Sequence, residues 1–154
     1  MRLFRESDAP ALARLTVAAI ESIGAHGYSP EQVTAWAARH PGPERFIGRA
    51  GRGSRICVAV DAGDNPIAYA LLEPDGHLDM LYCDPAHSRK GLADRLLKEA
   101  EEAAHAMELI RLYTEASELA RPAFERAGYA VQNRRDFEIG GVSIHNYAME
   151  KQLR

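Results

Sequence analysis

One stretch decides the fold: Leu81-Tyr82-Cys83-Asp84-Pro85-Ala86-His87-Ser88-Arg89-Lys90-Gly91-Leu92-Ala93-Asp94-Arg95-Leu96-Leu97. It begins with apolar strand formers, turns at Asp84-Pro85 and continues into a long amphipathic helix. The first turn of a helix has about four N–H groups without partners and a positive dipole end, so it can bind a phosphate through the backbone. Gly91 would let that phosphate approach closely, and Arg89 and Lys90 add positive charge. The stretch therefore predicts a strand, an anion-binding turn and a helix.

Two other phosphate-binding motifs are absent from the sequence. Neither the G-x-x-x-x-G-K-[ST] loop of nucleotide-hydrolysing proteins nor the G-x-G-x-x-G turn of dinucleotide-binding proteins occurs. These two classes are therefore poorly supported. On the local pattern alone, the alternative is an ordinary strand-to-helix turn that happens to be basic.

Residues Ser88 to Ala93 resemble the pyrophosphate-binding signature Q/R-x-x-G-x-G/A of the GNAT superfamily, the acyl-CoA-dependent N-acetyltransferases. Gly91 and Ala93 fit, whereas Ser88 stands where glutamine or arginine is usual. The rest of the chain follows the family's order of elements, so the resemblance covers nearly the whole chain. It implies a single GNAT domain over residues 1–154 with an α/β (α+β) fold. The expected sheet is mixed and mostly antiparallel, with about six to seven strands, a splayed parallel pair and about four flanking helices.

The composition is that of an ordinary globular protein. The 154 residues are 46% hydrophobic and 27% charged, and the formal net charge is −3. This charge gives no general attraction to nucleic acid or to an anionic membrane, and no apolar run reaches the roughly 20 residues that a membrane helix needs. We therefore expect a cytoplasmic protein without nucleic-acid or membrane partners. Cys57 and Cys83 are expected to be buried, reduced thiols.

Hydrophobic periodicity and turn residues predict the order of the elements. We expect, in chain order, a strand at 2–5, a helix capped by Ser7 or Asp8, a helix capped by Ser29, strands at 55–60, 66–72 and 77–83, a helix at 90–107, a strand at 110–113, a helix from 117 to 128, and strands at 129–138 and 142–151. Residues 39–53 are expected to form a loop with one helical turn around 43–48. The strand-helix-strand passage predicts a parallel pair between 77–83 and 110–113.

The resemblance implies where acetyl-CoA, the cosubstrate, would bind. In the superfamily the pantetheine arm lies between two splayed strands, and the pyrophosphate lies on the following turn. Pantetheine would then lie along Leu81, Tyr82 and Cys83, and the pyrophosphate would lie near Ser88, Arg89, Lys90, Gly91, Leu92, Ala93 and Asp94. Ser117 and Phe124 are further cofactor-binding candidates. The spacing of His and Cys residues indicates no metal site.

Acyl transfer to a primary amine needs a base, because an amine with a pKa near about 10 is mostly protonated at neutral pH. The candidates are Asp79, His77 and Glu73, on or beside the hairpin that leads into the cofactor strand. His77 and Asp79 are two residues apart and would share one face of the strand. For each of the three, the alternative is an ordinary structural or solvated polar residue.

The family often uses a tyrosine as the acid that protonates the leaving thiolate. Phe124 occupies that position here, and a phenylalanine cannot donate a proton. Tyr147, Tyr82 and Ser117 are alternative donors. The thiolate could also leave unaided, because the pKa of a thiol is only about 8.5.

The acceptor side carries the least specific signals. Tyr28 and Trp36 lie in the helical arm that covers the acceptor in the superfamily, although Trp36 could equally anchor a small core. Three arginines, at positions 121, 134 and 135, could face an acidic acceptor or the adenosine 3′-phosphate, but exposed arginines are usually only solvated.

Together these patterns predict an N-acetyltransferase that moves an acetyl group from acetyl-CoA to a primary amine by direct attack. The amine would belong to a small molecule or to a protein, and the last strand offers an edge for a homodimer. The alternative is a non-catalytic acyl-CoA-binding module that acts as a sensor or binds a partner. A longer acyl donor is a third hypothesis.

Overall fold

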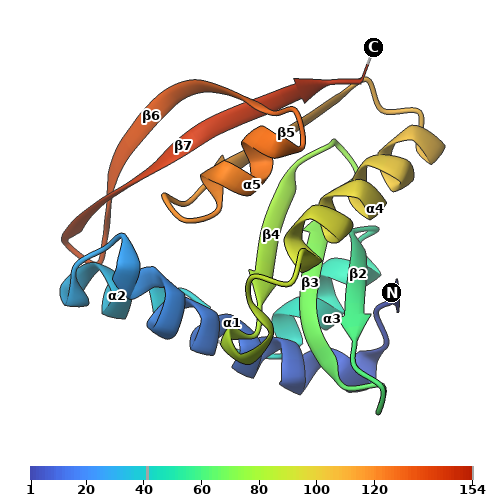
Figure 1. Ribbon diagram of the computed structural model, residues 1–154, viewed down its shortest axis with the longest axis horizontal. Coiled ribbons are helices and arrows are strands. Elements are labelled where there is room, and N and C mark those ends of the chain that lie inside the picture. Colours follow the sequence, from blue (N-terminus) through green and yellow to red (C-terminus); the bar gives the residue numbers. More distant parts are fainter. Residues whose placement is uncertain (41, 154) are drawn as a thin grey trace.

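The computed structural model describes residues 1–40 and 42–153 (Figure 1). The elements follow in the order β1 Arg2–Leu3, α1 Ala9–Ile23, α2 Pro30–Ala37, α3 Glu44–Gly51, β2 Arg55–Val60, β3 Pro66–Leu72, β4 Leu78–Cys83, α4 Leu92–Ala106, β5 Arg111–Ala116, α5 Arg121–Arg126, β6 Ala130–Ile139 and β7 Val142–Gln152. Short 3-10 turns lie at Glu6–Asp8, Gly24–His26 and Pro85–His87. The mixed, mostly antiparallel α+β fold is confirmed. Among the described residues, no helix combines the length and apolar character needed to span a membrane.

The strands form two antiparallel sheets. One has the order β1-β2-β3-β4, and the other has the order β5-β7-β6. The expected parallel pair of β4 and β5 is reduced to a single bridge between His77 and Tyr113. The strands therefore splay apart as expected, but they do not make one continuous sheet.

Two hydrogen bonds and one close backbone approach join β4 and β5 where they begin. The N–H of Tyr113 donates to the carbonyl of Gly76 over 3.0 Å. One residue further on, the buried hydroxyl of Thr114 donates to the carbonyl of Leu78 over 2.7 Å. Gly76 has φ of +100°, and a β carbon there would overlap the carbonyl oxygen of Arg111, so only glycine fits. Beyond Leu78 the strands separate, which leaves β4 as an edge of its sheet.

Helices cover both faces of the four-stranded sheet (Figure 1). On one face, α1 and α3 pack Leu12, Leu15 and Phe46 against Val58, Tyr69, Leu71 and Met80. On the other face, Leu92 and Leu96 of α4 pack on Ala59, Ala68 and Ala70. The small alanine side chains let α4 approach the sheet closely. The N-terminus of α4 is thereby fixed beside the end of β4.

The β6–β7 hairpin extends to α2 (Figure 1). Ser29 caps α2 by accepting a hydrogen bond from the N–H of Gln32, as expected. The Gln32 side chain in turn donates to the carbonyl of Ser143 on β7 over 2.9 Å. Gly140 and Gly141 have φ of +55° and +82°, which confirms the expected hairpin turn.

The first strand ends at Leu3 and not at residue 5, and β5 extends to Ala116 and not to residue 113. Three other differences from the expected elements have a clear structural cause. Residues 44–51 form a complete helix, because Phe46 buries its ring in the core and anchors α3. Helix α5 begins at Arg121 and not at Ser117, since Pro122 is tolerated only in a first turn. The Ser117 hydroxyl instead accepts from the N–H of Ala120 and stabilises the turn before the helix. Asp8 does not cap α1, because its carboxylate binds Arg2.

Candidate active site

The turn between β4 and α4 has the geometry of an anion-binding turn. Asp84 caps its 3-10 segment by accepting from the N–H of Ala86 over 2.9 Å. Arg89 and Gly91 then adopt left-handed φ values of 61° and 76°. Within the described part of the chain, no backbone N–H from residues 89 to 94 makes a hydrogen bond. These donors stand at the positive end of α4, which is the arrangement that holds phosphate groups.

A groove of about 580 Å³ begins at this turn and runs along β4. Ten of the predicted cofactor-binding residues line it: Leu81, Tyr82, Cys83, Ser88, Arg89, Gly91, Leu92, Ala93, Asp94 and Ser117. Lys90 is not among the lining residues. A β carbon placed on Gly91 would meet nothing within 4 Å, so the space above this glycine is open to a ligand. The groove and its donors therefore fit a pyrophosphate followed by an extended arm.

A second cavity, of about 260 Å³, lies on the other side of the gap between β4 and β5. The two cavities share five lining residues: Trp36, Leu81, Tyr82, Ser117 and Ala120. They therefore meet where the strands splay. A ligand in the groove and a ligand in this second, acceptor-side cavity can approach each other there.

Tyr28 and Trp36 both line the acceptor-side cavity, where the sequence had suggested them. The Tyr28 ring meets the Trp36 ring edge-on, with 5.4 Å between centroids. The Tyr28 hydroxyl donates to the carbonyl of His145 over 2.9 Å and accepts from the N–H of Glu118 over 2.8 Å. Tyr28 therefore offers its ring to the cavity, while its hydroxyl ties β7 to the loop after β5.

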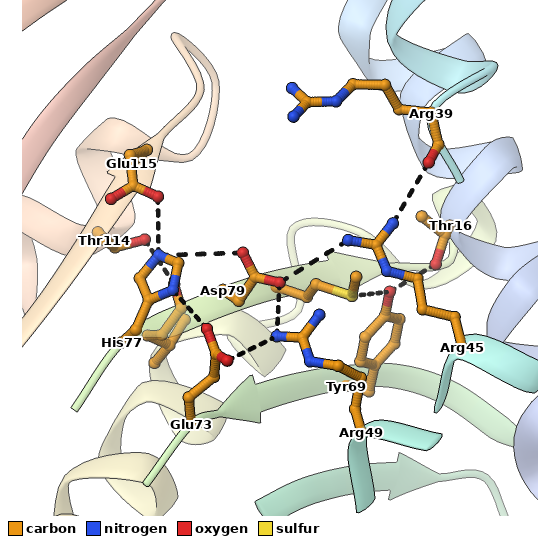
Figure 2. Close-up of polar contacts among 12 residues, drawn as sticks. Thr16, Arg39, Arg45, Arg49, Tyr69, Glu73, His77, Asp79, Thr114 and Glu115 are labelled. Carbon is orange, nitrogen blue, oxygen red and sulfur yellow. Dashed lines mark hydrogen bonds and ion pairs between the residues drawn. The ribbon is translucent and has the colours of Figure 1, made fainter. Parts of the chain in front are cut away.

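His77 lies between two carboxylates (Figure 2). Its Nδ1 is 2.6 Å from Glu73, and its Nε2 is 2.7 Å from Glu115. Burial lowers the pKa of His77, but the hydrogen bonds to Glu115 and Glu73 outweigh it and raise the pKa to about 9. The ring also stacks on Tyr113 at 4.8 Å. His77 is therefore an imidazolium at neutral pH, and this environment disfavours it as a base.

Asp79 and Glu115 line the acceptor-side cavity, whereas Glu73 and His77 lie behind them. One oxygen of Asp79 accepts from Arg49 over 2.8 Å (Figure 2). Its other oxygen is 3.9 Å from His77 Nε2. Of the three predicted base candidates, Asp79 is the one that reaches the cavity.

Three side chains in this cluster have the chemistry of metal ligands. Donor atoms of Glu73, His77 and Asp79 lie within 4.8 Å of one another. The Arg49 guanidinium is 3.3 Å from Glu73 and 2.8 Å from Asp79, so it already supplies the positive charge that these carboxylates need. The absence of a metal site stays a prediction.

A second polar cluster surrounds Glu118 beside the gap. His145 Nε2 is 2.5 Å from its carboxylate, and the Tyr147 hydroxyl donates to the same oxygen over 2.9 Å. The hydrogen bond from His145 is the largest cause that lowers the pKa of Glu118. The Tyr147 ring is covered by the Arg121 guanidinium at 4.6 Å, and Tyr147 lines neither cavity. Its proton is committed to Glu118.

Tyr82 and Ser117, the other two hydroxyl candidates, line both cavities. Burial raises the pKa of Tyr82 well above its usual value, so this phenol keeps its proton at neutral pH. Phe124 is 2% exposed, packs edge-on against Tyr129 and lines the acceptor-side cavity rather than the groove.

The two cysteines are unpaired and half-buried, where the sequence predicted buried thiols. Cys83 lines the groove. Burial, together with the nearby charge of Asp84, raises the pKa of Cys83 to about 11. The thiol is therefore protonated at neutral pH, which disfavours it as a nucleophile.

Sequence reasoning missed several residues of the site. Arg45 and Arg49 are four residues apart and share one face of α3, but residues 39–53 were expected to be mostly loop. Glu115 and Glu118 flank the end of β5, and nothing in their spacing indicates that they meet His77 and His145. The sequence has one signal for helix α3: an acidic residue, Glu44, lies in its first turn, and a basic residue, Arg49, lies in its last turn.

Comparisons with known proteins agree with this geometry. Residues 25–151 match the acetyltransferase (GNAT) domain family. The chain is 27% identical over 149 residues to the uncharacterized N-acetyltransferase YafP of Escherichia coli K12, covering 97% of this chain and 93% of that protein. A crystal structure of a GCN5-related N-acetyltransferase from Rhodopseudomonas palustris has a TM-score of 0.89 and 33% identity, covering 99% of this chain and 94% of that one.

A more distant structure has the same fold. The PaiA N-acetyltransferase of Thermoplasma acidophilum, solved in complex with coenzyme A, has a TM-score of 0.78 at 19% identity over 98% of this chain and 96% of its own. The splayed strands and the anion-binding turn define an acyltransferase fold. The chain belongs to the GNAT acetyltransferase family.

Proposed function

We propose that this chain moves an acetyl group from acetyl-CoA to a primary amine by direct attack. One observation carries the proposal: the groove with the free N–H donors of residues 89–94 meets a second, polar cavity in the gap between β4 and β5. Bound acetyl-CoA supplies the thioester in that gap. The unpaired edge of β4 suits the two amides of a pantetheine arm, because it offers N–H and C=O groups at a regular repeat.

Asp79 is the proposed base, acting directly or through a water molecule. It takes one proton from the acceptor ammonium, and the free amine then attacks the thioester carbon. A C–N bond forms, the C–S bond breaks, and a thiolate leaves. The attacking nitrogen then loses its second proton, which balances the proton that the thiolate takes up to become the CoA thiol. Glu115 is the second candidate, because it also lines the cavity. His77 acts as a positioning residue that orients Glu115 and holds it by a charge-assisted hydrogen bond.

Ser117 and Tyr82 are the proposed donors to the leaving thiolate. Both stand where the cavities meet. The Ser117 oxygen accepts a hydrogen bond from Ala120, which leaves its proton free to be donated. This arrangement compensates for Phe124, which has no proton to give.

The test combines binding and turnover. Calorimetric titration with acetyl-CoA and with CoA measures the affinity of the groove for each ligand. A thiol-release assay with a mixed panel of amines measures the rate of acetyl transfer. We expect binding of both ligands and release that depends on an amine. Binding without release from any amine would support the non-catalytic module instead, and no binding would overturn the placement of the groove.

We also propose a domain organisation, a cellular location and an oligomeric state. A single domain over residues 1–154, a cytoplasmic location and a homodimer are consistent with the features described. The two unpaired cysteines fit a reducing compartment. The expectation that the last strand offers this edge is wrong, because β7 lies between β5 and β6. Strand β6 is an exposed edge of the sheet, so it offers a surface on which two copies could pair.

A further inference from the structure

We propose that the acceptor is a small molecule that carries an oxyanion, such as a carboxylate, in addition to its primary amine. This inference rests on the proposed function and names the substrate class of the same site. It depends on the charges that face the acceptor-side cavity and on which of them already have partners.

The two carboxylates in the lining are already paired with cations. Asp79 accepts from Arg49 over 2.8 Å, and Glu115 is 2.7 Å from the His77 imidazolium (Figure 2). The guanidinium of Arg45 also lies 4.0 Å from the Asp79 carboxylate. These carboxylates are therefore poor sites for a second or third positive charge on an acceptor.

Two arginines in the lining are not neutralised in the same way. Within residues 1–40 and 42–153, neither Arg39 nor Arg135 forms an ion pair. Arg135 donates to the side-chain oxygen of Asn146 over 2.9 Å and lies over the Phe137 ring at 5.1 Å, so its guanidinium is held in place by neutral groups. Figure 2 shows the Arg39 guanidinium without a contact to the carboxylates drawn there. Its backbone carbonyl accepts from Arg45, and its backbone N–H donates to the carbonyl of Trp36.

The positive charges near Arg39 also affect the pKa of the neighbouring His40. Burial is the largest cause that lowers its pKa, and the charges of Arg45 and Arg39 lower it further, to about 4. His40 is therefore neutral at physiological pH and faces the Tyr82 ring at 5.7 Å. The corner of the cavity near the end of α2 already disfavours added positive charge, which is where an anionic group is stabilised.

The arrangement also orients the acceptor. Arg39 follows the end of α2 and Arg135 lies on β6, whereas Asp79 and Glu115 lie on the strands that flank the gap. An amine directed toward the gap leaves the oxyanion on the arginine side, where guanidinium groups bind it through charge-assisted hydrogen bonds. A cavity of about 260 Å³ has room for a molecule of amino-acid size.

The test uses matched pairs of acceptors that differ in one charge. Amino acids are compared with their amides, β-alanine is compared with propylamine, and spermidine represents a purely cationic amine. We expect kcat/KM for the carboxylate-bearing member to exceed that of its partner by at least about tenfold, with the difference mainly in KM. Equal values within the pairs, or a preference for spermidine, would overturn the inference.

Arginine variants locate the effect. Arg39→Gln and Arg135→Gln should each raise KM for the carboxylate-bearing acceptor by about tenfold and leave the amide or alkylamine partner unchanged. Arg134→Gln is the matched control, because Arg134 is adjacent to Arg135 but pairs with Asp136 and does not line the cavity. If both test variants behave like this control, the oxyanion is not bound where we place it.

A binding experiment separates failure of this inference from failure of the proposed function. Calorimetry on the protein saturated with CoA, titrated with propionate and with propionamide, requires no turnover. We expect propionate to bind more tightly and Arg39→Gln to remove the difference. Turnover of amines without any preference for the anion would contradict only the acceptor class. Absence of turnover with every amine would contradict the proposed function, and equal binding of the two ligands would then reject the oxyanion site as well.

Discussion

The hydroxyl of Thr114 donates to the carbonyl of Leu78 over 2.7 Å, at the last point where β5 and β4 touch before they diverge. Thr114 is 4% exposed and Leu78 is 1% exposed, so water cannot replace this bond. Thr114→Val keeps the shape but leaves the carbonyl unsatisfied. We expect a loss of about 1–3 kcal/mol in the free energy of unfolding, measured by urea denaturation.

Thr34→Val is the control for this substitution. Thr34 also donates its hydroxyl to a backbone carbonyl, that of Pro30, but on the exposed face of α2. Its replacement should change stability by no more than about 0.5 kcal/mol. Equal losses of unfolding free energy in both variants would show that the hydrogen bond between the two sheets stabilises the protein no more than an exposed one.

Gly91 gives the sharpest test of the groove. Gly91→Val places a branched side chain in the open space above the turn, so CoA affinity should fall below detection in calorimetry while the protein stays folded by circular dichroism. Gly141→Val is the matched control. It imposes similar strain, since φ is +82° against +76° and neither site has atoms within 4 Å, but it lies in the β6–β7 turn. CoA binding that survives Gly91→Val would place the pyrophosphate elsewhere.

His77 predicts a pH-dependent stability. Its pKa is raised from 6.5 to about 9 in the folded state, so its contribution is fully present below pH 6.5 and is lost as the pH rises through about 9. Urea denaturation should show a decline on the order of 3 kcal/mol at most across this window. His77→Gln should be less stable at pH 6 and should lack the decline. His105→Gln, at an exposed histidine 3.7 Å from Glu101, should retain it.

The base is tested by the acidic limb of the pH profile. If Asp79 takes the amine proton, Asp79→Asn should lower kcat/KM by about 10²- to 10⁴-fold and remove the limb. Glu115→Gln, on the other side of the gap, distinguishes the two carboxylates that line the cavity. A limb that survives in Asp79→Asn and disappears in Glu115→Gln would transfer the role to Glu115. A limb that survives in both variants would exclude both.

Substitutions at three hydroxyl groups test which acid protonates the leaving thiolate. Ser117→Ala and Tyr82→Phe should lower kcat, and the loss should be largest with a donor whose leaving thiol has a high pKa. Tyr147→Phe should have the smaller effect, because its hydroxyl donates to Glu118 outside both cavities. If Tyr147→Phe has the largest effect, the loop that carries Glu118 must rearrange when acetyl-CoA binds.

Local chemistry accounts for what could be predicted of the fold. Strands β2 and β3 have the expected bounds, because each is an apolar run between turn residues. The turn at residues 88–93 could be found because glycine and a helix start leave a recognisable pattern in adjacent residues. The full length of helix α3 could not be predicted, because glycines at 48 and 51 are unfavourable in a helix. The helix is stabilised by Phe46, which packs against core residues distant in the sequence.

The polar contacts on the acceptor side could not be predicted for a related reason. Glu115 meets His77, and Glu118 meets His145, across separations of 38 and 27 residues. Such contacts depend on how two sheets are placed relative to each other, which no local spacing encodes. The same holds for Asp79: its place on β4 could be read from the sequence, whereas its Arg49 partner could not.

The division between the two cavities has a consequence for how such a protein diverges. Arg39 follows α2 and Arg135 lies on β6, and neither lines the groove that begins at residues 88–94. Substitutions at these two positions change which amine is selected without altering the thioester side. A lineage with this architecture can exchange its acceptor through a few surface changes while inheriting its acyl donor unchanged.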